Sequence, residues 1–132
     1  MYKRQPSNVK VIGWADASAF WSAVDIALST SDNEGMPVAL IEAQLAGIPV
    51  VATDVGSNAE VIEDEVTGLV VEKDVADLAH AVSRLISDGD LRERMGIAAM
   101  DRASAEFGVK TMLERHALVY AGIQTSRSAG SH

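Results

Sequence analysis

The chain of 132 residues, 48% of them hydrophobic and 23% charged, is long enough for one globular domain with a moderate core and too short for two. Its formal net charge of −8 argues against a nucleic acid or an anionic membrane as the main partner, because those surfaces require clustered lysine and arginine. There is no cysteine, and no apolar run approaches the roughly twenty residues that a transmembrane helix needs. The N-terminus lacks the pattern of a signal peptide, so we expect a cytoplasmic protein.

The first half of the chain alternates predicted strands and helices. Residues 9–12 are an apolar run ended by Gly13, which predicts a short buried strand, and residues 15–24 predict a helix. Residues 25–30 predict the next strand. The segment 37–46 is apolar at nearly every position, so we expect a helix that is buried on most of its faces against a sheet.

The ends of this helix are marked by local chemistry. Pro37 suits the first helical position, and Gly47 followed closely by Pro49 is a typical C-terminal stop. The first turn would then present free backbone N–H groups to an anion, and Gly35 would let the backbone approach it closely. With a strand predicted at 49–53, the segment forms a strand-helix-strand unit with parallel strands.

The second half of the chain predicts one more strand, at residues 68–71, followed by helices. Asp74 is a good N-cap for a helix whose apolar residues recur at the helical period. Asp90, with Glu93 at the capping-box position, predicts the start of another helix that runs towards Phe107. Residues 109–123 predict a last helix.

Two glutamates, Glu34 and Glu42, flank the predicted start of the 37–46 helix with seven residues between them. A carboxylate in so apolar a helix is expected to be buried, and a buried carboxylate needs a partner. No lysine or arginine lies between Lys10 and Lys73, so a ligand rich in hydroxyl groups is the partner we predict for Glu42. Glu34 has an alternative interpretation, as a solvated acid favoured by the helix dipole.

The run from Ser31 to Glu42, followed by Ala-Gly-Ile-Pro-Val-Val-Ala-Thr-Asp at residues 46–54, resembles the C-terminal domain of retaining glycosyltransferases with the GT-B fold, the "glycosyl transferases group 1" family. The likeness covers about residues 8–121. It implies an α/β fold, a partial Rossmann-like parallel sheet of about four strands flanked by helices. In such sheets ligands bind beyond the carboxyl ends of the strands, here at residues 31–35 and 54–57.

The resemblance also implies roles for individual residues. Glu42 would accept hydrogen bonds from the ribose of a nucleoside-diphosphate sugar, and Glu34 would contact the transferred sugar as the catalytic residue. The backbone of Gly35, Met36, Pro37 and Val38 would hold the diphosphate, and the turn at Gly13 and Trp14 would border the base. Transfer in this family requires no metal or other cofactor.

Parts of the family pattern are missing. A complete member has an N-terminal acceptor domain, and its donor domain begins with two further strand-helix units that contain a glycine turn and an Arg/Lys pair. We therefore expect a fragment, inactive alone, with a non-matching leader at 1–7, a partial nucleotide-sugar-binding domain at 8–124 and a disordered tail at 125–132. The missing strands would lie between strands 9–12 and 25–30, so either these two pair directly or a second chain completes the sheet.

Several alternatives stay open on the sequence alone. Trp14 either stacks on a base or packs against the protein, and packing is favoured for an aromatic residue at a strand end. The loop 55–58 is either a turn into a helix capped by Ser57 or Asn58 or a ligand contact. The rival functions are a non-catalytic nucleotide or sugar-phosphate binding module, a subunit-assembly module, and another GT-B enzyme such as a phosphorylase or epimerase. A homo-oligomer through the sheet edge or the last helix is a further expectation.

Overall fold

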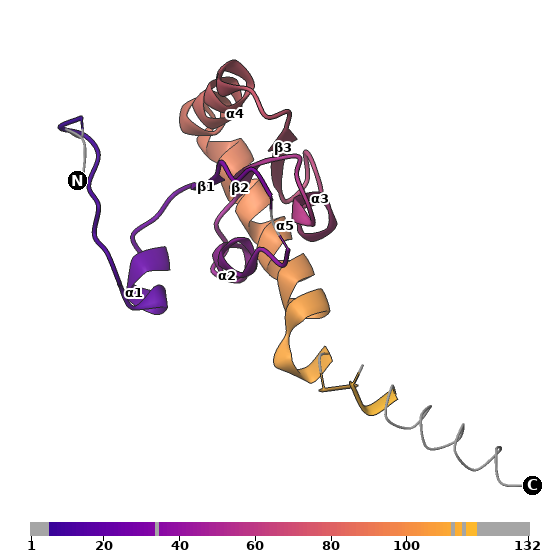
Figure 1. The fold of residues 1–132 in the computed structure, drawn as a ribbon. Helices are drawn as coiled ribbons and strands as arrows, with labels where there is room; N and C mark the ends of the chain where they lie inside the picture. Colours follow the sequence, from indigo (N-terminus) through magenta and orange to yellow (C-terminus); the bar gives the residue numbers. More distant parts are fainter. Residues whose placement is uncertain (1–5, 34, 112, 115, 119–132) are drawn as a thin grey trace, which may run out of the picture.

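A three-stranded parallel sheet forms the centre of the computed structural model, in the order β1 (Ala27–Ser29), β2 (Val50–Thr53) and β3 (Gly68–Val71) (Figure 1). The model describes residues 6–33, 35–111, 113–114 and 116–118. In the register of the sheet Ala27 lies opposite Val50, and Val50 lies opposite Gly68. All four residues of β2 are buried, as expected for the central strand of a parallel sheet covered on both faces.

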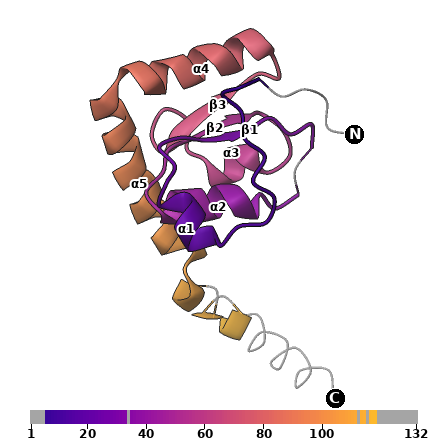
Figure 2. The ribbon, with the colours of Figure 1, turned by 90° about the vertical axis from the view of Figure 1, so that its left-hand side faces the viewer.

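Helices cover the two faces of the sheet. Figure 2 shows α2 (Val38–Leu45) on one face and α4 (Val75–Ser87) on the other, with α5 (Gly89–Phe107) running along the side of the molecule. Two separate clusters of buried residues result. The α2 cluster contains Ala27, Leu40, Ala43, Ile48, Val50, Ala52, Val61 and Ile62. The α4 cluster contains Val51, Leu69, Ala81, Leu85 and Met95.

Two short helices complete the part that bears on the site. The chain enters β1 from α1 (Ala17–Trp21) and leaves β2 into α3 (Asn58–Val61). Asp16 caps α1, since its side chain accepts a hydrogen bond from the N–H of Ala19 at 3.0 Å. The predicted helix at 15–24 therefore exists but is shorter than expected.

The expected α/β fold with a parallel sheet is confirmed, with three strands where about four were predicted. Residues 9–12 are not a strand in the structure. Val9, Val11 and Ile12 are 47–59% exposed, and the N–H of Val9 donates to the carbonyl of Pro6 at 3.0 Å. An extended segment is stable only beside a strand and under a covering layer, and this segment has neither in the described part of the chain. Direct pairing between residues 9–12 and β1 is thus contradicted.

Strand β1 lies at the edge of the sheet, and Leu28 on it is 52% exposed. This edge is the one at which the sequence predicted a discontinuity. Oligomerisation through it stays a prediction.

The expectation that the 37–46 helix is buried on most of its faces is wrong. Within α2 the buried residues are Leu40, Ala43 and Gln44, which form one stripe, whereas Val38 is 57% exposed. Helices α1 and α5 also contact α2, yet they leave Val38, Glu42 and Leu45 exposed. The apolar residues on the outer side of α2 are therefore not buried in the described structure.

The start of α5 also differs from the prediction. Asp88, not Asp90, caps the helix, because its side chain accepts a hydrogen bond from the N–H of Leu91 at 2.8 Å. Helix α4 ends at Ser87, and Gly89 is the first residue of α5. Asp74 caps α4 as predicted, accepting from the N–H groups of Ala76 and Asp77.

The assignment of Asp88 as the cap of α5 can be tested by comparing it with its neighbour Asp90. We expect Asp88→Ala to lower the free energy of unfolding by about 1 kcal/mol, since it leaves the N–H of Leu91 without its acceptor. Asp90→Ala, which removes only a favourable charge from the first turn, should cost a few tenths of a kcal/mol. Urea unfolding of both variants measures the difference, and an equal or larger loss in Asp90→Ala would contradict the assigned cap.

The last predicted helix is only partly described. The chain bends at Gly108, and residues 109–111, 113–114 and 116–118 are helical. Residues 119–123, the predicted end of this helix, and the predicted disordered tail at 125–132 lie outside the described residues. No helix in the described part of the chain is long and apolar enough to cross a membrane.

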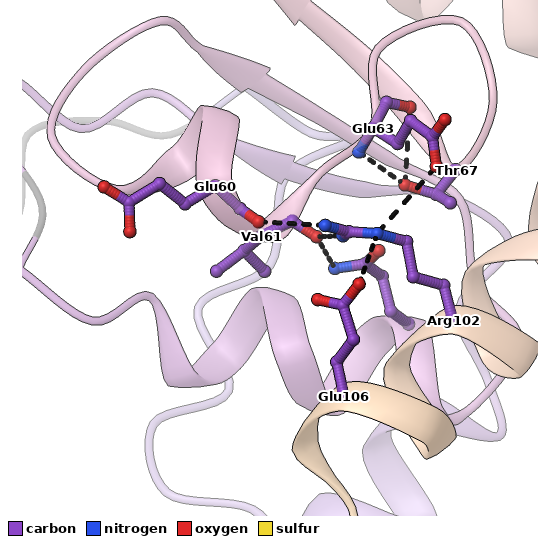
Figure 3. A network of polar contacts seen from close by, with 7 residues as sticks. Glu60, Val61, Glu63, Thr67, Arg102 and Glu106 are labelled. Carbon is purple, nitrogen blue, oxygen red and sulfur yellow. Dashed lines mark hydrogen bonds and ion pairs between the residues drawn. The ribbon is translucent and has the colours of Figure 1, made fainter.

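Arg102 ties α5 to the end of α3 (Figure 3). Its guanidinium donates to the carbonyls of Glu60, at 3.0 Å, and Val61, two groups that a helix end leaves without partners. It also forms an ion pair with Glu106 at 3.2 Å on its own helix. The same Val61 carbonyl accepts a hydrogen bond from Gln44 of α2 at 3.1 Å, so α2, α3 and α5 are held together at one point.

An exposed ion pair joins the turn before β3 to α4. Arg84 donates two hydrogen bonds to the Glu65 carboxylate, at 2.6 and 2.7 Å. Hydrogen bonding to Arg84 lowers the pKa of Glu65 from its usual value of 4.5. The folded chain therefore holds Glu65 as a carboxylate more strongly than the unfolded chain does.

This shift predicts a pH dependence with a defined sign. Because the pKa is lower in the folded state, the pair stabilises the fold above about pH 4.5, and this contribution is lost as the pH falls below that value. We expect Glu65→Gln to be slightly less stable than the parent at pH 7, with a gap that closes on acidification. Urea unfolding across this pH range measures the gap, with Glu93→Gln, a change at an exposed acid of α5, as the control. A gap that widens on acidification would contradict the assignment.

Candidate functional site

Two neighbouring cavities lie where α1, β1 and α2 meet. The first, of about 460 Å³, is bounded by the turn at residues 11–13, α1 and α2, and both Gly13 and Glu42 line it. The second, of about 280 Å³, lies between β1 and the first turn of α2, with Pro37 and Val38 in its wall. Phe20 and Trp21 line both cavities. Four of the residues predicted for donor binding therefore border two adjacent cavities.

Glu42 is exposed on the second turn of α2, not buried as the sequence predicted. It points away from the buried stripe of the helix, which explains why a carboxylate is tolerated there. Its Oε2 accepts a hydrogen bond from the indole Nε1 of Trp21 at 3.3 Å. Among the residues that the structure describes, no ion pair includes Glu42.

The predicted anion site at the start of α2 is only partly as expected. The helix begins at Val38, with Pro37 at the N-cap position and no side-chain cap. The N–H of Val38 is not free, since it donates to the carbonyl of Met36 at 2.9 Å. Gly35 is exposed, and Met36 is 63% exposed. Glu34 lies outside the described residues.

The turn at Gly13 has the backbone that requires glycine, with a φ of 65°. Trp14 beside it is 92% exposed and does not line the first cavity, so the structure does not support the favoured packing interpretation. The indole is available to solvent. Stacking of Trp14 on a base stays a prediction.

Strand ends and loops meet at the carboxyl edge of the sheet, as the topology predicts. Thr53, the last residue of β2, donates its hydroxyl to the carbonyl of Ser31 at 2.8 Å. Asn58 is buried and donates its side-chain amide to the carbonyl of Thr53 at 2.9 Å. The loop 55–58 leads into α3, with Ser57 at the N-cap position but no capping hydrogen bond from its side chain.

Two residues near these features were not singled out from the sequence. Lys73, just after β3, forms an ion pair with Asp32 at 2.6 Å and brings a positive charge to the carboxyl edge of the sheet. A lysine so soon after a predicted strand could have been recognised from the sequence as a candidate for this edge. Trp21 contacts Glu42, twenty-one positions away, and the sequence contains no local pattern that predicts such a contact.

Comparison with known proteins decides the family. The family model described as "Glycosyl transferases group 1" matches residues 2–88. This chain belongs to the glycosyl transferases group 1 family. The family resemblance seen in the sequence is thereby confirmed.

Relatives in this family are named glycosyltransferases. The chain is 34% identical over 104 residues to the D-inositol 3-phosphate glycosyltransferase of Streptosporangium roseum, covering 78% of the chain and 24% of that protein. It is 33% identical over 97 residues to the GDP-mannose-dependent alpha-(1-6)-phosphatidylinositol monomannoside mannosyltransferase of Mycobacterium tuberculosis strain H37Rv, covering 73% of the chain and 25% of that protein. The chain thus spans about a quarter of the length of these relatives.

Solved structures of other proteins share the fold. Anabaena HepE in complex with UDP and glucose superposes with a TM-score of 0.80 at 28% identity, over 88% of this chain and 32% of that one. Sucrose-phosphate synthase from Thermosynechococcus elongatus superposes with a TM-score of 0.78 at 26% identity, over 83% of this chain and 28% of that one. This chain is therefore similar to part of each of these proteins, the part that matches the sheet and helices described above.

Proposed function

We propose that this chain supplies the donor-binding portion of a glycosyltransferase that moves a sugar from a nucleoside-diphosphate sugar to an acceptor with retention of configuration. One observation carries the proposal: Glu42 and Gly13, which are separated in the sequence by α1, β1 and the first turn of α2, line one cavity, and the start of α2 lines the adjacent one. Membership of the group 1 family supports it. The similarity to a protein solved with UDP and glucose supports the class of ligand.

The chemistry of the two cavities fits a nucleotide with a ribose and a diphosphate. A carboxylate is an acceptor-only group with about four lone-pair positions, which suits two adjacent ribose hydroxyls that both donate to Glu42. The start of α2 directs the positive end of a helix dipole toward the second cavity, beside Pro37 and Val38. Gly35 and Met36 precede this helix, where their backbone would contact the diphosphate.

In the proposed reaction the bond between the anomeric carbon and the diphosphate oxygen breaks, and a bond to the acceptor oxygen forms on the same face of the sugar. The acceptor hydroxyl gives its proton to the departing diphosphate. Glu34 is the residue we propose beside the transferred sugar. The departing diphosphate would be stabilised by backbone dipoles and basic groups, with no metal ion. Such groups act by preorganised electrostatic catalysis. Gly13 and Trp14 would border the base. We place this reaction in the cytoplasm.

The isolated chain is expected to bind a nucleotide but not to transfer sugar, since the described residues include no second domain that holds an acceptor. Isothermal titration of the purified chain with UDP, GDP, UDP-glucose, UMP and GMP tests the proposal. We expect saturable binding of one of the two diphosphates and much weaker binding of the matching monophosphate, because the monophosphate lacks the group held at the start of α2. A chain that is folded by circular dichroism and binds none of these ligands would contradict the proposal.

A further inference from the structure

We propose that Trp21 is a positioning residue that holds the Glu42 carboxylate in the orientation that receives the ribose hydroxyls of the donor. This inference rests on the proposed function, because it deepens the role of the same site. It is carried by the hydrogen bond from the indole Nε1 to Glu42 Oε2, at 3.3 Å.

The indole is well placed to act as a fixed point. Trp21 packs against the α2 cluster of buried residues, and its ring meets that of Phe20 edge to face, with centroids 4.8 Å apart and an interplanar angle of 72°. Both rings belong to α1, whose start is capped by Asp16. A ring held by packing on the core has few alternative orientations, so the direction of its N–H is set before any ligand arrives.

Glu42, by contrast, would have little to hold it without this contact. Its side chain is exposed on α2, and none of the ion pairs in the described structure includes it. A free glutamate side chain loses rotamer entropy when a ligand fixes it, which weakens binding. The hydrogen bond from the Trp21 indole restricts the Glu42 side chain before the ligand binds, so less rotamer entropy is lost on binding.

The geometry leaves the carboxylate available. An indole has a single N–H and can only donate, so it occupies one acceptor position of Oε2. The remaining lone pairs of Glu42, including those of Oε1, can still accept hydrogen bonds from two ribose hydroxyls. Trp21 lines both cavities, and Glu42 lines the first. The hydrogen bond between them therefore lies in the wall of the cavity where the nucleotide is proposed to bind.

A thermodynamic cycle tests this role. Trp21→Phe keeps an aromatic ring but removes the N–H. We expect it to weaken UDP binding by about three- to tenfold, as for the loss of one hydrogen bond. In the double variant with Glu42→Ala it should add nothing, because the residue through which it acts is gone. It should also leave the binding of a UDP analogue that lacks both ribose hydroxyls unchanged.

The opposite pattern would overturn the inference. If Trp21→Phe weakens the analogue as much as UDP, or if its effect adds fully to that of Glu42→Ala, Trp21 supports the cavity in general and does not position Glu42. Urea unfolding of the Trp21→Phe variant establishes that all titrations use folded protein.

A measurement without nucleotide separates this inference from the proposed function. The indole N–H resonances of Trp14 and Trp21 are distinct groups in a ¹⁵N–¹H spectrum, and Glu42→Ala should shift that of Trp21 while leaving that of Trp14 in place. An unmoved Trp21 resonance overturns the positioning role even where UDP binds. Failure of the parent chain to bind UDP or GDP overturns the proposed function, and the ribose role of Trp21 with it, even where the resonance moves.

Discussion

Replacing Gly96 with alanine is expected to lower the free energy of unfolding by about 3 kcal/mol, the upper end of the usual cost of overpacking. Gly96 lies in α5, where the helix crosses the turn between α2 and β2. A Cβ added there would lie 2.2 Å from the carbonyl oxygen of Gly47 and 3.2 Å from its carbon. Both atoms belong to the backbone, so the overlap cannot be relieved by turning a side chain, and α5 would have to move away from α2.

Gly89 in the same helix is the matched control for this change. A Cβ at Gly89 would have Arg92 Nη2 as its nearest neighbour, at 3.8 Å, which is an ordinary contact at the end of a flexible side chain. Because alanine favours a helix more than glycine does, we expect Gly89→Ala to be neutral or stabilising by up to about 1 kcal/mol. Urea unfolding measures both variants. Equal stability of Gly96→Ala and the parent would show that the packing of α5 on the turn after α2 is not as close as described.

This packing matters for the site because α2 carries Glu42. The inner face of α2 is held by the α2 cluster and by the hydrogen bond from Gln44 to Val61, and α5 packs at Gly96 on the turn that follows the helix. The outer face, with Glu42, is left for the cavity. The helix is thus fixed from the side opposite to its proposed ligand.

Glu42→Ala is expected to weaken the binding of UDP by about ten- to a hundredfold, which corresponds to roughly 1.5–3 kcal/mol for hydrogen bonds to a charged group. The carboxylate is the acceptor that lines the first cavity, and alanine cannot replace it. Isothermal titration measures the change. Since Glu42 is exposed, the variant should unfold at nearly the same urea concentration as the parent.

Asp101→Ala is the control for the loss of one negative charge, because Asp101 is an exposed acid of α5 away from both cavities. It should bind UDP slightly better or unchanged, as the repulsion between an acidic chain and an anionic ligand falls. If Glu42→Ala binds UDP as tightly as the parent, Glu42 does not contact the ribose, and the proposed orientation of the donor is wrong.

The features that could be predicted from the sequence are those encoded by neighbouring residues. The three strands of the sheet and α4 were found because apolar runs, Asp74 as a cap and Gly47 as a stop act within a few residues. Parallel pairing followed from the strand-helix-strand order, and the carboxyl edge of the sheet followed from the pairing. The proximity of Glu42 to the Gly13 turn could be expected only from the family resemblance.

The features that were missed depend on what lies beside a segment in space. Residues 9–12 have the composition of a strand, yet no described strand lies next to them to pair with. The apolar outer side of α2 suggested burial, but composition does not state how many layers surround a helix. The contact between Trp21 and Glu42 joins two helices that β1 separates in the sequence, and only the fold brings these residues together. Asp88 and Asp90 are equally good caps by composition, and the direction of the chain after α4 selects Asp88.

The central claim is that the start of α2 and the Glu42 carboxylate together grip a nucleoside diphosphate. Backbone ¹⁵N–¹H resonances recorded during titration with UDP and GDP test this most directly. The account predicts that one of the two nucleotides shifts the amides of Gly13, Gly35 and residues 38–42, together with the Trp21 indole, while those of α4 stay in place. Shifts centred on α4, or no shift with either nucleotide at saturating concentration, would contradict it.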